Sequence, residues 1–226
     1  MYEPNAFQKI RAIVNAKTVS LLGSAPGDYN MGLFPLDQPL VCINAAALGI
    51  SGLNRVPEIT IINTSVAGSS NAGKPTRELL QHISTKMLVI VESGFSIEQA
   101  EKVFEPITRD MTEVITLDER SQFLEAFLEK PLAGRTGSHN VPSTGFFACL
   151  VLLACGASKV KTFGLSFHNG HSYLNQTYKR EHIEKDCEVL HWLLAKSLPV
   201  EFSEEVISAA RKLMPNKKPR SLFFLK

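Results

Sequence analysis

The sequence lacks the features that mark secreted, metal-stabilised or repetitive proteins. It has no uninterrupted apolar run near its N-terminus that would resemble a signal peptide. Its few cysteines lack the spacing of zinc ligands, and most lie inside apolar runs, so we expect buried, reduced thiols in a cytoplasmic protein. These cysteines are Cys42, Cys149, Cys155 and Cys187. No internal repeat or low-complexity tract indicates a solenoid or a disordered chain.

The charge of the chain is also low. Its 226 residues carry a formal net charge of +2, which is too small to indicate nucleic-acid binding. A hydrophobic content of 44% is enough for one well-buried core, and we predict a single domain over residues 1–208. We expect residues 209–226 to be a basic tail, which carries Phe223 and Phe224 within the run Leu222–Leu225. Aromatic and basic residues together suit an anionic membrane surface, although a C-terminal strand or core anchor is an open alternative.

Short apolar runs rich in β-branched residues alternate with helical patterns, which predicts an α/β fold with a mostly parallel sheet and helices on both faces. The predicted strands are 18–23, 39–44, 58–63, 86–93, 113–117, 159–164 and 199–202. The predicted helices are 5–16, 96–104, 119–130 with Asp118 as cap, 145–157, 185–196 and 203–213. The helix over 145–157 is apolar on nearly every face but too short to span a bilayer, so we expect it in the core.

Small or amide residues follow the first three strands. Gly23 and Ser24 form a turn after the first, while Asn44 and Asn63 end the next two. Ligands of open α/β sheets bind at this carboxyl edge, and an amide can contact a base or ribose. NAD is disfavoured because Asn44 stands where an acidic residue would bind the ribose. The phosphate-loop spacing of residues 68–74 is rejected, because the following residue is proline rather than serine or threonine.

Most of the chemistry lies in residues 141–186. Ser143 or Thr144 can cap the apolar helix, and the N–H groups at a helix start make an anion site. His182 begins a later helix, and an imidazole with an ordinary pKa of about 6.5 can accept a proton near neutral pH. Asp186, one turn later, could orient it, as could Glu184.

These motifs resemble a known family. Pro142–Gly145 at the head of an apolar helix resembles the S sialylmotif of animal sialyltransferases. The run from there through GLSFHNGHSY to His182 and Asp186 resembles bacterial lipooligosaccharide sialyltransferases. The resemblance extends more faintly to GSAPG and to the segments ending at Asn44 and Asn63. It implies one Rossmann-like domain, a GT-A-like variant, that binds CMP-sialic acid beneath a short lid at about 167–182.

The resemblance also implies roles for individual residues. Residues that contact the nucleotide, sugar carboxylate or phosphate would be Gly23, Ser24, Asn44, Asn63, Ser143, Thr144 and Gly145. His168 and Tyr173 would stabilise the leaving phosphate, and His182 would be the general base. No cofactor or metal is expected, the partners would be a nucleotide-sugar donor and a glycan or glycolipid acceptor, and an oligomer is possible.

The expected activity is an inverting, metal-independent transfer of sialic acid or a related sugar from a CMP-activated donor. Ser24, Ser166 and His168 replace an asparagine, an aspartate and a tyrosine of the bacterial enzymes, which leaves the donor sugar open. The alternative is a non-catalytic nucleotide-binding protein of the same fold. A pterin pyrophosphokinase-like enzyme ranks last, because it would need magnesium and no clustered carboxylates are apparent.

Overall fold

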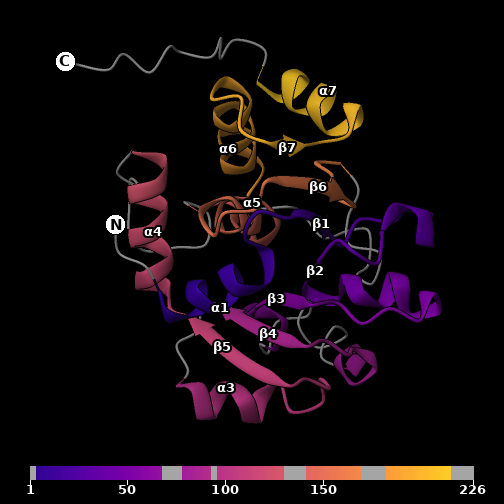
Figure 1. The fold of residues 1–226 in the computed structure, drawn as a ribbon. Coiled ribbons are helices and arrows are strands. Elements are labelled where there is room, and N and C mark those ends of the chain that lie inside the picture. The colour runs from indigo at the N-terminus through magenta and orange to yellow at the C-terminus, as the bar shows by residue number, and fades with distance from the viewer. Residues whose placement is uncertain (1–3, 68–77, 93–95, 130–140, 169–181, 215–226) are drawn as a thin grey trace.

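Seven parallel strands form one open sheet at the centre of the molecule. The computed structural model describes residues 4–67, 78–92, 96–129, 141–168 and 182–214. The strands lie in the order β5-β4-β3-β2-β1-β6-β7, and Figure 1 shows them stacked from β7 near the top to β5 near the bottom. Their bounds are β1 Thr18–Leu22, β2 Leu40–Ile43, β3 Ile59–Asn63, β4 Met87–Val91, β5 Met111–Ile115, β6 Lys159–Phe163 and β7 Val200–Glu201. All seven strands predicted from the sequence are present, although β5 lies two residues upstream of the predicted 113–117 because Thr116 and Leu117 begin α4.

The sheet is covered on both faces, which confirms the predicted α/β class. Alternate strand residues point to opposite faces, so the sheet contributes to two separate apolar cores. The first core packs against helices α1 (Asn5–Val14), α4 (Leu117–Leu128), α5 (Thr144–Ala154), α6 (Ile183–Ala195) and α7 (Glu204–Leu213). The second packs against α3 (Ile97–Val103) and 3-10 segments such as Asn44–Leu53.

The order of the strands reverses at one place. Strands β1 to β5 follow one another away from β1 in one direction, whereas β6 lies on the other side of β1, with Thr18 paired to Lys159. The carboxyl ends of β1 and β6 therefore flank the topological switch point, where open α/β sheets bind ligands.

One helix agrees with its prediction in burial, and another begins at a different cap. Helix α5 is buried over most of its length, as its composition predicted. Asp118, however, was wrongly assigned as the cap of α4. The cap is Thr116, whose hydroxyl accepts from the N–H of Glu119 while the Glu119 carboxylate accepts from the N–H of Thr116. This reciprocal pair satisfies two backbone donors, which moves the helix start upstream.

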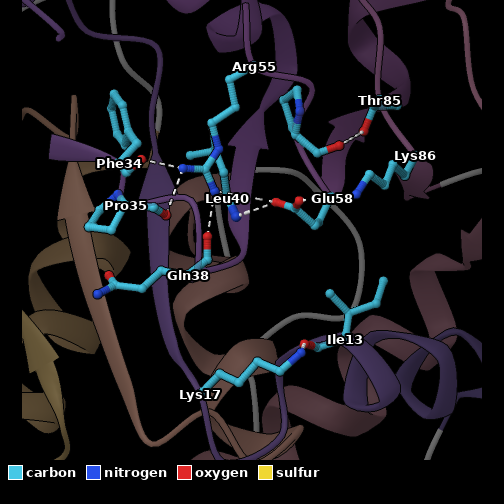
Figure 2. A network of polar contacts seen from close by, with 11 residues as sticks. Ile13, Lys17, Phe34, Pro35, Gln38, Leu40, Arg55, Glu58, Thr85 and Lys86 are labelled. Carbon is cyan, nitrogen blue, oxygen red and sulfur yellow. Dashed lines mark hydrogen bonds and ion pairs between the residues drawn. The ribbon is translucent and has the colours of Figure 1, made fainter. Parts of the chain in front are cut away.

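The amino-terminal edge of the sheet is held by a buried arginine. Arg55 donates to the carbonyls of Phe34, Pro35 and Gln38, and Figure 2 shows its guanidinium between this loop and Glu58. The Glu58 carboxylate accepts from the N–H of Leu40 at 2.7 Å and lies 3.7 Å from the arginine. This network joins the starts of β2 and β3, at the opposite edge from the switch point.

The predicted lid (about 167–182) and the end of the tail (215–226) fall almost wholly outside the described residues. In the ranges given above, no helix is both long and apolar enough to cross a membrane.

Candidate functional site at the carboxyl edge of the sheet

The turn after β1 lies directly against the turn after β6. The N–H of Gly23 donates to the carbonyl of Phe163 at 2.7 Å, and that of Ala25 donates to Gly164 at 2.9 Å. A Cβ atom on Gly23 would come 2.5 Å from the carbonyl oxygen of Gly164, so only glycine allows this approach. Ser24 follows in the turn and is 8% exposed. The two turns thus form the floor of the switch point.

Polar side chains link the ends of β2, β3 and β4. The Oδ1 of Asn44 accepts from the backbone N–H of Asn63 at 3.0 Å, and the Nδ2 of Asn63 donates to Glu92 at 2.8 Å. Thr64 donates to the carbonyl of Glu92 at 2.7 Å. The two amides predicted at strand ends are therefore neighbours in one network, to which Glu92 adds a carboxylate.

The network continues to the start of α5 through Arg120 of α4. Its guanidinium pairs with the Glu92 carboxylate and donates to the carbonyl of Pro142. Burial lowers the pKa of Arg120 to about 9, and Asp186 opposes that shift, so the side chain remains charged at neutral pH.

The start of α5 lies at the same edge, because a Cβ atom on Gly145 would come 2.8 Å from the side chain of Leu165, just after β6. Ser143 occupies the N-cap position, but neither it nor Thr144 supplies the predicted cap, since no side-chain capping hydrogen bond forms. The N–H groups of this first turn are therefore not satisfied by a capping side chain. Such N–H groups, with the positive end of the helix dipole, can bind phosphate or carboxylate.

His182 is held beside this helix start. Its Nδ1 lies 2.9 Å from the carbonyl oxygen of Val141, and a carbonyl can only accept, so Nδ1 carries the proton. The other ring nitrogen, Nε2, is then the basic one. The orienting group at Nδ1 is this carbonyl, whereas the Asp186 carboxylate accepts from the N–H of Ser143 at 2.7 Å.

The two predicted phosphate-stabilising residues differ in what is described. His168 is exposed and follows β6, where its backbone N–H donates to the hydroxyl of Ser166 at 3.2 Å. Tyr173 lies outside the described residues. In the part of the chain with defined placement, no group of three or more histidine, cysteine, aspartate or glutamate side chains could hold a metal ion.

Direct contacts link some of the predicted residues along this edge. They link Asn44 to Asn63, the turn at Gly23 to the turn after β6, and that turn to Gly145.

Sequence reasoning missed Glu92 and Arg120. Glu92 had a signal, because it follows β4 as Asn44 follows β2. Arg120 had none, because an arginine on an amphipathic helix ordinarily faces solvent.

A comparison with solved structures supports the fold. No model of a known protein family matches the sequence, and a search of curated proteins found no relative. The monofunctional α-2,3-sialyltransferase Cst-I from Campylobacter jejuni superposes with a TM-score of 0.51 and 13% identity, covering 86% of this chain and 79% of that one. The sialyltransferase CstII from the same organism, solved with cytidine-5'-monophosphate, gives 0.46 and 12%, covering 85% and 83%.

The score below 0.5 carries no weight here, and at 13% identity the likeness to Cst-I establishes a shared fold alone. The resemblance to sialyltransferases that the sequence motifs predicted is confirmed at that level. The chemistry rests on the residues at the carboxyl edge.

Proposed function

We propose that this chain is an inverting, metal-independent glycosyltransferase that transfers sialic acid or a related sugar from a CMP-activated donor to a glycan or glycolipid acceptor. One observation carries the proposal. The imidazole of His182 is fixed by the carbonyl of Val141, two residues before the cap position of α5. A proton acceptor thus adjoins a helix start that suits an anion, and a transfer from a nucleotide donor needs both.

The proposed reaction is a direct displacement at the anomeric carbon. The acceptor hydroxyl gives its proton to Nε2 of His182 as its oxygen bonds to that carbon, and the bond from the carbon to the phosphate oxygen breaks. The electron pair of that bond leaves with CMP, and the configuration inverts. The N–H groups of Thr144 and Gly145 and the hydroxyl of Ser143 would stabilise the phosphate or hold the sugar carboxylate, since the N–H of Ser143 already donates to Asp186. His168 and Tyr173 would stabilise the leaving phosphate.

The nucleoside would lie over the switch point. Gly23 and Ser24 allow close approach of the backbone, and the amides of Asn44 and Asn63 offer hydrogen bonds to ribose or base. The sequence motifs at these positions resemble those of enzymes that use CMP-activated donors, which makes CMP the first nucleotide to test.

The first test is calorimetric titration with CMP, beside UMP, GMP and NAD, with and without magnesium. We expect selective CMP binding that magnesium does not change. Absence of CMP binding would leave the fold and overturn the function, and a requirement for magnesium would overturn metal independence.

The role of His182 is tested by His182→Ala, with His82→Ala as the control because His82 is exposed before β4 at the other edge. We expect His182→Ala to lose transfer by about 100-fold or more while it still binds CMP. The control should keep both. Equal loss of binding and transfer in folded His182→Ala would exclude the assignment as base.

The alternative function is a nucleotide-binding protein without transferase activity, which the serine at position 24 favours because the bacterial enzymes usually have asparagine there. Incubation with CMP-sialic acid and no acceptor separates the two, because a transferase slowly hydrolyses its donor and a pure binder does not.

Contact of the tail with anionic membrane is tested by removing residues 214–226, which should weaken binding to anionic vesicles.

A further inference from the structure

One peptide group at the head of α5 is held from both sides by buried charges. The carbonyl oxygen of Pro142 accepts from Nη2 of Arg120, and the N–H of Ser143 donates to Oδ1 of Asp186 at 2.7 Å. These two polar groups belong to the same peptide bond. Arg120 comes from α4 and Asp186 from α6, so two helices far apart in the sequence fix the orientation of this peptide plane.

The two charges are deeply buried. Arg120 is 1% exposed and Asp186 is fully buried. The guanidinium carbon of Arg120 also lies 4.8 Å from the centre of the Phe147 ring, on the second turn of the helix that the peptide precedes. Burying charged side chains contributes little net stability even when they attract one another, because desolvation offsets the attraction. Stability therefore does not by itself account for charged residues at these positions.

The same backbone segment holds the proposed base. The carbonyl of Val141 accepts from His182, and the N–H of Asp186 donates to the carbonyl of His182 at 2.9 Å. The start of α6 therefore contacts Val141 through the side chain of His182 and Ser143 through the side chain of Asp186. A shift of the segment from Val141 to Ser143 would therefore move the carbonyl that holds the imidazole and the start of α5 together.

We propose that Arg120 and Asp186 are positioning residues that fix the proposed base and the proposed phosphate-binding helix start relative to one another. This inference rests on the proposed function. Glu92 extends the arrangement, because it pairs with Arg120 and accepts from Asn63. The strand ends assigned to the nucleoside and the segment assigned to the chemistry thereby share one rigid set of contacts.

The test compares Asp186→Ala, which removes the acceptor for the Ser143 N–H, with Asp186→Asn, which keeps an oxygen there. We expect folded Asp186→Ala to lose about 100-fold in kcat, the order of loss that a misplacement of about 1 Å produces. Asp186→Asn should recover most of it. An unchanged kcat in folded Asp186→Ala would overturn the proposal.

Arg55→Ala is the matched control, because Arg55 is a buried arginine that also donates to backbone carbonyls but at the opposite edge of the sheet. It should lower stability and leave kcat of the folded protein unchanged. A similar loss of kcat in this control would mean that general destabilisation, rather than positioning, explains the effect.

Amide hydrogen exchange gives a readout that does not depend on activity. We expect faster exchange at the Ser143 amide in Asp186→Ala than in Asp186→Asn. Unchanged exchange there would contradict the proposal that Asp186 holds this peptide group. Failure of the proposed function is distinguishable from failure of this inference. In the first case wild-type protein would neither bind CMP nor transfer sugar, whereas the exchange result decides separately whether the peptide is held.

Discussion

The side chain of Asn44, at the end of β2, accepts a hydrogen bond of 3.0 Å from the backbone N–H of Asn63, at the end of β3. Asn44 itself has a positive φ of 51°, a conformation that asparagine tolerates better than most residues. Asparagine at this position thus provides an acceptor for a backbone N–H and also tolerates the left-handed backbone conformation.

We expect Asn44→Ala to lower the free energy of unfolding by about 2 kcal/mol, since it removes the hydrogen bond and adds backbone strain. Asn44→Asp keeps an acceptor oxygen and should stay close to wild type, while Asn44→Gly should lose only the hydrogen-bond part. Urea unfolding measures all three. Wild-type stability in Asn44→Ala would mean that the contact contributes nothing.

Gly164 should not accept a side chain. Its φ is +60°, and a Cβ atom there would come 2.5 Å from the hydroxyl of Tyr29 and 2.6 Å from the carbonyl oxygen of Gly23. We expect Gly164→Ala to destabilise the protein by about 2–4 kcal/mol and to weaken CMP binding, because the turn after β1 must move. Gly52→Ala is the control, since a Cβ atom at Gly52 meets nothing within 4 Å. Equal melting temperatures of the two variants would contradict this packing.

Arg55 should matter for stability and not for binding. Its side chain is 5% exposed, and removing it leaves the carbonyls of Phe34, Pro35 and Gln38 without their donor (Figure 2). We expect Arg55→Ala to cost about 3 kcal/mol of unfolding free energy. Calorimetry on the folded variant should give an unchanged CMP affinity. A large loss of affinity would mean that the two edges of the sheet are coupled.

Because two thiols are buried, we expect the free energy of unfolding to fall at alkaline pH. Burial raises the pKa of Cys42 and of Cys149 above the ordinary value of 9.0. Above pH 9 the unfolded chain therefore ionises these thiols while the folded chain keeps their protons. The stabilisation is complete below pH 9 and is lost as the pH rises, approaching a slope of about 1.4 kcal/mol per pH unit for each thiol.

Urea unfolding under reducing conditions between pH 8 and 10.5 measures this slope. Cys42→Ala should have lower stability throughout but a shallower fall with pH, because one thiol whose pKa is raised by burial is gone. An identical slope in wild type and variant would show that other groups control the alkaline transition.

The sequence predicted the fold better than the site. Strand runs such as residues 86–93 and the almost entirely apolar α5 are local signals, and the structure confirms a strand and a buried helix there. The sequence also predicted that Asn44 and Asn63 lie at one edge of the sheet, because a parallel sheet brings all carboxyl strand ends to the same edge.

What the sequence could not predict depends on contacts between distant segments. The burial of Arg120 follows from Glu92, Pro142 and Asp186, which belong to three other parts of the chain. The contact at the N-cap of α5 is similar, because the backbone N–H of Ser143 donates to Asp186, which belongs to another helix. Periodicity and capping rules describe neighbours along the chain and carry no information about such contacts.

The place of β6 beside β1 has a consequence for how the protein reaches its native state. Strands β1 to β5 can pair in the order in which they leave the ribosome, but β6 joins β1 only after roughly 140 further residues have been made. Until then the edge of β1 that pairs with β6 has no partner, and the turn at Gly23 lacks its contact with the turn at Gly164. The ligand-binding edge is therefore completed late in folding, and a chain truncated before β6 would expose an apolar strand edge prone to aggregation.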